Sequence, residues 1–139
     1  MGYYVNLQEA NFAIGAENIE EATRLLKALN HDPNARKGGG SWRGGQLVSR
    51  HFSWMSANYD EELDSAVEIF EALGFEVHTD ETGSLELMYY DSKIGDEGQF
   101  VNAVAHLANE DWFLVWRGED GAIWRDSALG TQNGTVVFL

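Results

Sequence analysis

The sequence predicts an α+β fold, a two-layer domain with three helices on one face of an antiparallel or mixed sheet, as in ferredoxin-like and related folds. Segments of period-two hydrophobicity and segments of helical periodicity follow each other in the order β-α-β-α-β-β-α-β-β-β. This order has neither a regular βαβα alternation nor an internal repeat, which argues against a parallel α/β sheet and a repeat protein. A length of 139 residues is typical of one domain, so we expect a single domain over 1–139.

The N-terminal part predicts a strand and then a helix. Apolar residues alternate with polar ones over 3–14, which indicates one long or bulged strand. Asn18 and Glu21 resemble a capping pair, and apolar residues then recur at helical spacing over 19–30. Pro33 ends the helix, because proline disfavours helical geometry in the residue before it.

A glycine-rich stretch at 34–47 interrupts the regular pattern. It holds five of the fifteen glycines and has no periodicity, so we expect a long mobile loop there. A strand over 48–54 and a helix beginning at Asn58 are predicted next. Gly74 ends that helix, and Phe75 is placed to fold back on its last turn.

The remaining chain predicts a hairpin, a third helix and three further strands. The hairpin covers 75–89, and Asp96 is expected to cap the helix that follows it. The last strands are expected at 112–116, 122–125 and 135–139, joined by glycine-rich turns at 118–121 and 130–134.

The composition limits the classes of function. A net charge of −14, from 23 acidic and 9 basic residues, argues against nucleic acid as a partner and favours a basic protein surface. The chain has no cysteine, no signal-peptide pattern and no apolar run long enough for a bilayer. These features predict a cytoplasmic protein without a membrane partner.

No motif predicts catalysis, a metal or a cofactor. The glycines at 38–45 do not end in the Gly-Lys-Ser/Thr of a phosphate loop, and no dinucleotide-binding glycine pattern runs through them. No Gly-x-Ser-x-Gly elbow occurs. The four histidines are scattered without the spacing of metal ligands: His31, His51, His78 and His106.

The glycine-rich stretch carries a local excess of positive charge, because no acidic residue lies between Asp32 and Asp60. A cationic loop with an aromatic side chain suits an anionic or aromatic ligand, through charge-assisted hydrogen bonds and stacking. The alternative is a solvated loop without a ligand. The candidate binding residues here are Arg36, Lys37, Trp42, Arg43 and Arg50.

The C-terminal hairpin is a second candidate surface. Trp116 and Trp124 flank its turn and suit a cross-strand pair, which would form an interaction surface if exposed. Glu119 and Asp120 form the turn between them. The alternative is that both tryptophans belong to the core and that the acidic pair only shapes the turn.

The C-terminal half also resembles small uncharacterised proteins of phages and actinobacteria. The resemblance rests on 90–93, on 100–107 and above all on the Gly-Glu-Asp-Gly turn within 116–125 that ends in Trp-Arg. It implies an origin in a mobile element. A small acidic phage protein would suit an inhibitor that presents negative charge to a host nucleic-acid-binding enzyme, such as a defence nuclease.

These observations lead to three hypotheses of function. The first is a non-enzymatic acidic binding protein, of the type of a phage inhibitor, that engages a basic host protein through its acidic surface and its C-terminal aromatic hairpin. The second is a binder of a small anionic ligand or nucleotide at the cationic loop. The third is a small hydrolase with a pocket of carboxylates beside His51 or His106. A homodimer is compatible with all three.

Overall fold

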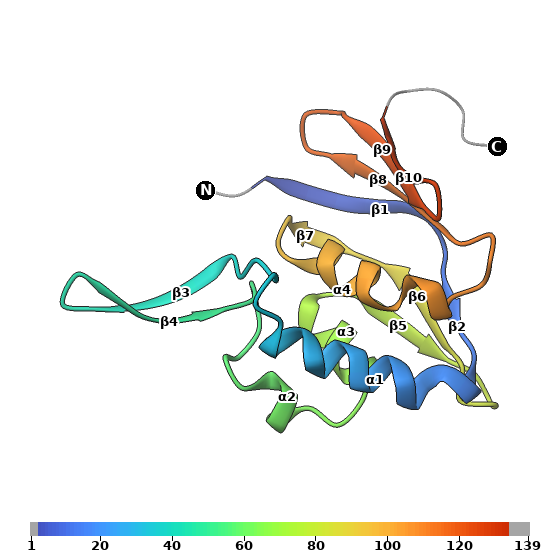
Figure 1. The fold of residues 1–139 in the computed structure, drawn as a ribbon. Helices are drawn as coiled ribbons and strands as arrows, with labels where there is room; N and C mark the ends of the chain where they lie inside the picture. Colours follow the sequence, from blue (N-terminus) through green and yellow to red (C-terminus); the bar gives the residue numbers. More distant parts are fainter. Residues whose placement is uncertain (1–2, 134–139) are drawn as a thin grey trace.

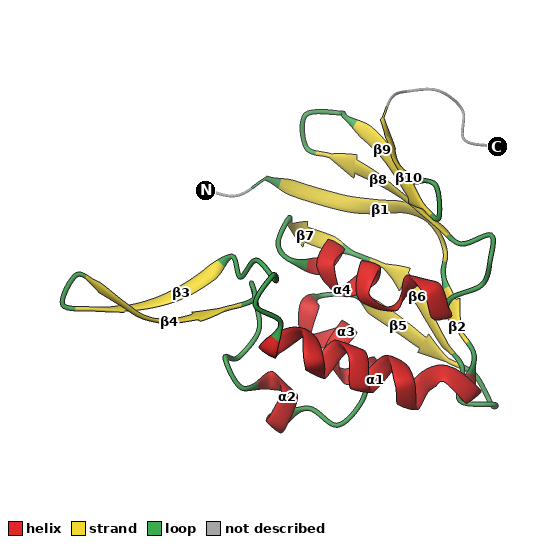
Figure 2. Ribbon diagram, viewed as in Figure 1, coloured by secondary structure: helices red, strands yellow, loops and turns green. Residues whose placement is uncertain are grey.

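The computed structural model describes residues 3–133, except for the side chains of Ser41, Trp42, Val48 and Ser49. Figure 1 shows the chain from its N-terminus to its C-terminus, and Figure 2 separates helices from strands. The helices are α1 (Ile19–Ala28), α2 (Tyr59–Glu62), α3 (Ala66–Leu73) and α4 (Glu97–Val104), with 3-10 turns η1 (Ala16–Asn18), η2 (Leu29–His31) and η3 (Ala105–Leu107). The strands are β1 (Tyr4–Asn11), β2 (Ala13–Ile14), β3 (Gly39–Arg43), β4 (Gln46–His51), β5 (Glu76–Thr79), β6 (Leu85–Tyr89), β7 (Asp91–Lys93), β8 (Phe113–Gly118), β9 (Ile123–Ser127) and β10 (Gly130–Asn133).

The prediction of an α+β fold with antiparallel strands is confirmed for the described residues. The strands form three groups, in the orders β10-β9-β8-β1-β7, β2-β6-β5 and β3-β4. All strand pairs among the described residues of these groups are antiparallel. The sequence predicted one sheet, whereas the strands of the structure are divided into three groups.

Backbone hydrogen bonds connect the first two groups. The Leu7 N–H donates to the Tyr90 carbonyl at 2.9 Å, and the Leu87 N–H donates to the Phe12 carbonyl at 3.1 Å. The segment 4–14 therefore runs antiparallel to the segment 85–93 over most of its length. The register of β1 against β8 shifts between Leu7 and Glu9, which agrees with the bulged first strand that the alternation predicted.

The core lies between these strands and the helices. Buried strand residues such as Leu87 and Leu114 meet buried helix residues such as Leu26, Phe70 and Phe100 in one hydrophobic cluster. Helix α1 packs against both α3 and α4. Three amphipathic segments thus bury their apolar stripes against one another and against the strands.

The second predicted helix is two helices in the structure. Leu63 has an extended backbone (φ −103°, ψ 144°), which separates α2 from α3. Ser65 then caps α3, because its hydroxyl accepts a hydrogen bond from the Glu68 N–H at 3.4 Å. The helical periodicity spanned this break because α2 and α3 both bury apolar side chains. At the other end of α3, Gly74 is left-handed (φ +115°) and the Phe75 N–H donates to the Phe70 carbonyl, as predicted.

The glycine-rich segment is a β-hairpin where the sequence predicted a loop without regular structure. Its two-residue turn is Gly44-Gly45, with φ +58° and +79°, a conformation that favours glycine at both positions and suits the twist of a hairpin. Strands β3 and β4 pair only with each other. Figure 1 shows the hairpin projecting away from the rest of the chain.

The C-terminal strands also differ from the prediction. Residues 130–133, expected in a turn, form β10 and pair with β9. Gly130 has φ +95°, so the tight turn lies before it, around 128–130. The strand predicted at 135–139 lies outside the described residues.

Candidate binding surfaces

The first candidate surface is the projecting hairpin, which we call the cationic arm and define as residues 36–51. Arg43 lies at its tip, directly before the Gly44-Gly45 turn, and Arg50 lies near its base, opposite Gly40. Both side chains are exposed, and no ion pair within the described residues involves either of them. Arg36 is exposed at the base. The predicted contribution of Trp42 concerns a side chain outside the described part.

The base of the arm is fastened to the start of α4 by Asp96. One oxygen of this carboxylate, Oδ2, accepts hydrogen bonds from the N–H groups of Gly38 at 3.0 Å and Ser53 at 2.7 Å. Gln99, one turn along α4, accepts a hydrogen bond from the Arg36 N–H at 2.8 Å. Asp96 is the N-cap residue of α4, as predicted, but its side chain makes no capping hydrogen bond to the helix and binds the arm instead.

Lys37 points toward the protein and not toward a ligand site. Its ammonium group donates to the carbonyl of Asn30 at 3.0 Å and lies 5.4 Å from the centre of the Phe52 ring. This cation–π contact and hydrogen bond hold the lysine between η2 and the end of β4. Of the predicted ligand-binding cations in the arm, the three arginines are therefore the exposed ones.

Trp54, at the base of the arm, is a site residue that the sequence reasoning missed. Among the described residues it is the only one other than glycine with a positive φ, at +68°, and its side chain is 51% exposed. A bulky residue in this region carries backbone strain of about 1–3 kcal/mol. The indole lies against the segment before α4, because its Nε1 atom would be only 2.9 Å from a Cβ atom added at Gly95. No sequence signal marks a tryptophan for this conformation.

Behind Trp54 lies a buried carboxyl group, Glu97, which is only 5% exposed. Its Oε2 atom accepts a hydrogen bond from the Gly95 N–H at 2.8 Å. Burial raises the pKa of Glu97 above its ordinary value, and hydrogen bonds to the backbone and to Tyr90 only partly offset this. Burial also raises the pKa of Tyr90, to about 12, with a further contribution from the charge of Glu97. Glu97 and Tyr90 are thus both buried near the base of the arm.

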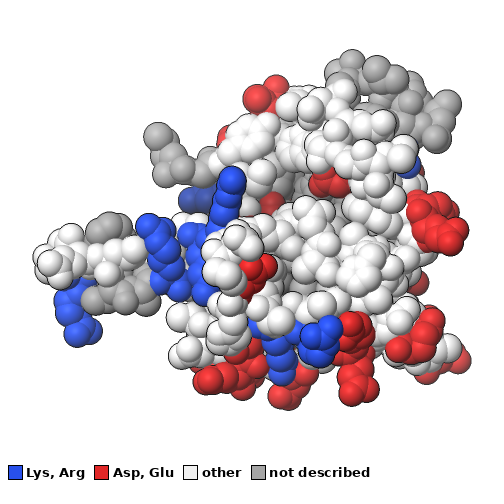
Figure 3. Space-filling view, viewed as in Figure 1, with Lys and Arg blue, Asp and Glu red and all other residues white. Residues whose placement is uncertain are grey.

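The second candidate surface is acidic and lies on α2, α3 and their connection. Between Arg50 and Lys93 the chain has eleven acidic residues and no lysine or arginine. We call the carboxylates of the helical part the acidic helical face: Asp60, Glu61, Glu62, Asp64, Glu68 and Glu71. Figure 3 shows basic side chains on and around the arm, and acidic side chains along the lower edge of the molecule with some basic ones beside them.

Most of the acidic helical face has no basic partner. Within the described residues the ion pairs are Arg24 with Glu21, on α1, and His31 with Asp60. Burial pushes the pKa of Asp60 upward, but hydrogen bonds from His31 and Asn30 outweigh this and hold it below its ordinary value. The remaining carboxylates of this face make no ion pair in the described part of the chain.

The C-terminal hairpin is not the exposed aromatic surface that the sequence offered as one alternative. Trp116 and Trp124 lie opposite each other in register, but Trp116 is only 4% exposed and Trp124 is partly buried against the core. The Trp116 indole N–H donates to Asp126 Oδ2 at 3.1 Å. Trp116 is therefore a core residue, because the strand face that carries it packs against the aromatic rings of Phe75 and Tyr90.

Glu119 and Asp120 hold the N-terminal strand in place. Glu119 Oε1 accepts a hydrogen bond from the Tyr4 N–H at 2.9 Å, and the Glu119 N–H donates to the Tyr4 carbonyl at 2.9 Å. Asp120 accepts hydrogen bonds from the hydroxyl of Tyr3 and from the Ala122 N–H. Both side chains are exposed, but their hydrogen bonds are those of a turn and its neighbouring strand.

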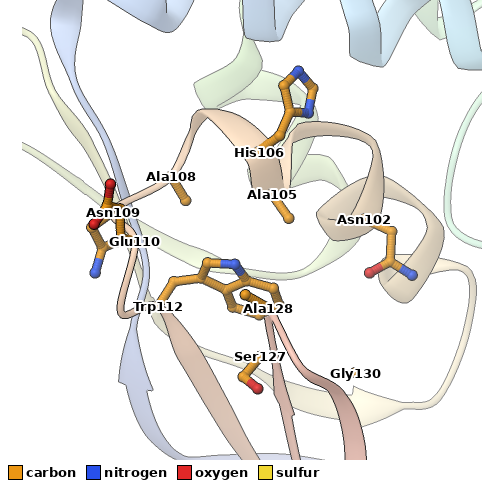
Figure 4. A pocket seen from close by; sticks show the side chains of 10 residues that line it. All are labelled: Asn102, Ala105, His106, Ala108, Asn109, Glu110, Trp112, Ser127, Ala128 and Gly130. Carbon is orange, nitrogen blue, oxygen red and sulfur yellow. The ribbon is translucent and has the colours of Figure 1, made fainter.

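A groove lies between α4 with its following turn and the last strands. It has a volume of about 630 Å³, within the range of small-molecule sites. Figure 4 shows the indole of Trp112 across its middle, with Asn102 and His106 on the helical side and Ser127 on the strand side. A smaller neighbouring hollow of about 330 Å³ is lined by Trp116 and Trp124. The only carboxylate that lines the larger groove is Glu110, which is exposed.

The described part of the chain has neither a metal site nor a membrane-spanning helix. No group of three or more histidine or acidic side chains within the described residues is arranged to hold a metal ion. No helix in that part of the chain is long and apolar enough to cross a bilayer. Comparison of the chain with family models, with curated proteins and with solved structures found no match.

Proposed function

We propose that the protein is a non-enzymatic binding protein whose acidic helical face engages a basic surface of a protein partner. The observation that carries the proposal is the separation of charge. The chain has eleven acidic residues and no lysine or arginine between Arg50 and Lys93, and six of the acidic residues lie on two consecutive short helices, α2 and α3, and their connection. Uncompensated charge of one sign steers an oppositely charged partner and speeds its association.

The groove with Trp112 is not the pocket of buried carboxylates that the hydrolase hypothesis requires. His106 and Ser127 line it, but the only carboxylate among its lining residues in the described part of the chain is the exposed Glu110. A catalytic site needs an acid, base or nucleophile within reach of a substrate. The buried carboxyl group of the structure, Glu97, lies behind Trp54 and is not among the residues that line the groove. His51 packs beside Gly39 in the hairpin, with its Nδ1 atom 3.0 Å from the Phe52 carbonyl oxygen, and no carboxylate is in hydrogen-bonding contact with it.

The proposal includes the architecture and the setting that the sequence predicted. The contacts of α1 with α3 and α4 support a two-layer arrangement with the three helices on one face, related to the ferredoxin-like folds. The resemblance to small phage proteins supports a cytoplasmic inhibitor. Its partner would be a host defence or nucleic-acid-binding protein, whose basic groove the acidic helical face covers in place of nucleic acid.

A second candidate, the binding of a small anion at the cationic arm, is favoured by one observation. Arg43 and Arg50 are exposed and without ion pairs in the described part of the chain, on a hairpin whose base carries an exposed indole at Trp54. A thermal-shift screen across nucleotides and phosphorylated metabolites tests this candidate. A bound anion raises the melting temperature, whereas a flat screen removes the support.

The principal proposal is tested by affinity capture from a host lysate at low and high salt. The expected result is a basic protein that is retained at about 0.05 M salt and released at about 0.5 M, because screening weakens contacts between exposed charges. The face variant Glu61→Lys, Glu62→Lys, Glu71→Lys should lose the partner. A control variant with the same change of charge elsewhere, Glu9→Lys, Glu81→Lys, Glu110→Lys, should keep it. Equal loss in both variants would contradict a specific role of the acidic helical face.

A further inference from the structure

The cationic arm and the acidic helical face belong to the same chain, and their charges are complementary. The arm carries Arg36, Arg43 and Arg50, and no acidic residue lies between Asp32 and Asp60. The face carries six carboxylates, most of them exposed. Because the two surfaces lie on different elements, each copy of the chain presents both the cationic arm and the acidic helical face to other copies.

The length of the arm separates its tip from the charge of the protein body. Strand β3 has five residues, so Arg43 lies about 15 Å from the base at a rise of about 3.3 Å per residue. The Debye length is about 8 Å at physiological ionic strength. The tip is therefore largely screened from the net charge of −14, and a surface that it touches meets mainly the positive charge of the arginine.

The same length keeps two bodies apart when the arm of one lies against the face of the other. Repulsion between the bodies is then screened across the gap, whereas contacts between arginine and carboxylate groups act at short range. Fixing the arm at its base limits the entropy lost on docking, and the Asp96 carboxylate does this through the N–H groups of Gly38 and Ser53.

Trp54 supplies the apolar part of this surface. Trp54 directly follows Ser53, at the point where the chain leaves the arm. Ser53 lies close to Gly38, where the chain enters the arm, because a Cβ atom added at Gly38 would be only 2.8 Å from the Ser53 hydroxyl oxygen. The strained backbone of Trp54 and its close approach to Gly95 hold a ring that is 51% exposed. Exposed and rigid tryptophan and arginine side chains are the residue types that dominate protein interfaces.

We propose that the cationic arm, with Trp54 at its base, docks on the acidic helical face of a second copy of this chain. The contact is heterologous, because arm and face are different surfaces, so it links copies head to tail. It goes beyond the proposed function by assigning a partner to the arm. It also implies that a basic protein partner and a second copy compete for the same face.

Sedimentation equilibrium of the full chain at concentrations up to about 1 mM tests the proposal. Association is expected to be strongest near 0.1–0.2 M salt. It should weaken near 0.01 M, where the Debye length of about 30 Å lets the bodies repel, and near 1 M, where it is about 3 Å and contacts between charges are screened. A chain that stays monomeric at every salt concentration would overturn the proposal.

Charge exchange between two variants gives the decisive result. The arm variant Arg43→Glu, Arg50→Glu and the face variant Glu61→Lys, Glu62→Lys, Glu71→Lys should each associate about tenfold more weakly, and their mixture should regain association. Both variants keep a net negative charge, so overall attraction does not explain recovery. A control variant, Lys27→Glu, Arg117→Glu, makes the same change of charge outside the cationic arm and should associate like the unchanged chain. A mixture that stays monomeric would refute the contact.

Trp54 gives an independent readout. Trp54→Ala should weaken self-association about tenfold at every salt concentration, because an apolar contact is little affected by screening. The proposed function is tested separately by the capture experiment. The arm variant should still retain the basic partner, so loss of self-association with retained capture contradicts only the present inference.

Discussion

The carboxylate of Asp96 accepts a hydrogen bond from the backbone N–H of Ser53 at 2.7 Å, across 43 positions of the chain. The same oxygen accepts a second bond, from Gly38, on the other strand of the hairpin base. One side chain therefore joins both ends of the cationic arm to the start of α4.

Asp96→Ala should loosen the base of the arm. Two backbone N–H groups lose a charged acceptor, which should lower the free energy of unfolding by about 1–3 kcal/mol. Chemical denaturation measures the change, and amide hydrogen exchange should show faster exchange at Gly38 and Ser53 than elsewhere. Glu81→Gln, at an exposed carboxylate without a described hydrogen bond, is the control and should change stability little. Unchanged exchange at both amides would contradict the role of Asp96.

The backbone strain at Trp54 can be measured by comparing the stability of two substitutions. Trp54→Ala and Trp54→Gly both remove the indole, but only glycine adopts φ +68° without steric cost. Trp54→Gly should therefore be more stable than Trp54→Ala by about 1 kcal/mol, after the greater flexibility of glycine in the unfolded chain is included. Equal stability of the two variants, or a more stable alanine variant, would show that the position is not strained.

Glu97 should make the protein less stable as the pH rises. Burial raises its pKa in the folded protein above the ordinary value of 4.5, so the folded state binds the proton more tightly than the unfolded state. The free energy of unfolding should fall as the pH rises from about 4.5 through the folded pKa. Glu97→Gln, which keeps an acceptor for the Gly95 N–H, should flatten this part of the profile. A profile as steep as that of the unchanged chain would contradict the assignment.

Asp60 should act in the opposite direction. Burial alone would raise its pKa, but hydrogen bonds from His31 and Asn30 hold it below the ordinary value of 3.8. Its contribution to stability is present above that value and is lost as the pH falls through the folded pKa. Asp60→Asn should cost about 1 kcal/mol at neutral pH and reduce the loss of stability in acid. Glu61→Gln, at the exposed neighbour, should leave both properties unchanged.

Local sequence patterns predicted the helices and strands whose burial is periodic. Helices α1 and α4, the ending of α3 at Gly74 and the β5–β6 hairpin follow from spacing and turn residues. The break between α2 and α3 was missed because Leu63 keeps the apolar spacing while its backbone is extended. The Gly44-Gly45 turn is a known hairpin signal, but the surrounding glycines hid it in a pattern that is typical of loops.

The candidate surfaces were predictable only in part. The arginines of the arm were found from the local excess of positive charge. Lys37 points inward because it contacts Asn30 and Phe52. Trp116 is buried because it packs against the rings of Phe75 and Tyr90. Local sequence patterns do not encode these contacts between separate segments of the chain. Trp54 has a positive φ and lies against Gly95, which is far away in the sequence, and no local pattern encodes either feature.

The salt dependence of binding to the captured basic partner decides whether the acidic helical face recognises it. Affinities of the unchanged chain, the face variant (Glu61→Lys, Glu62→Lys, Glu71→Lys) and the control variant (Glu9→Lys, Glu81→Lys, Glu110→Lys) would be measured from about 0.05 to 0.5 M salt. The account predicts a steep loss of affinity with salt for the unchanged and control chains, and weak binding with a shallow slope for the face variant. A face variant that binds with the affinity and slope of the control would contradict recognition through the acidic helical face.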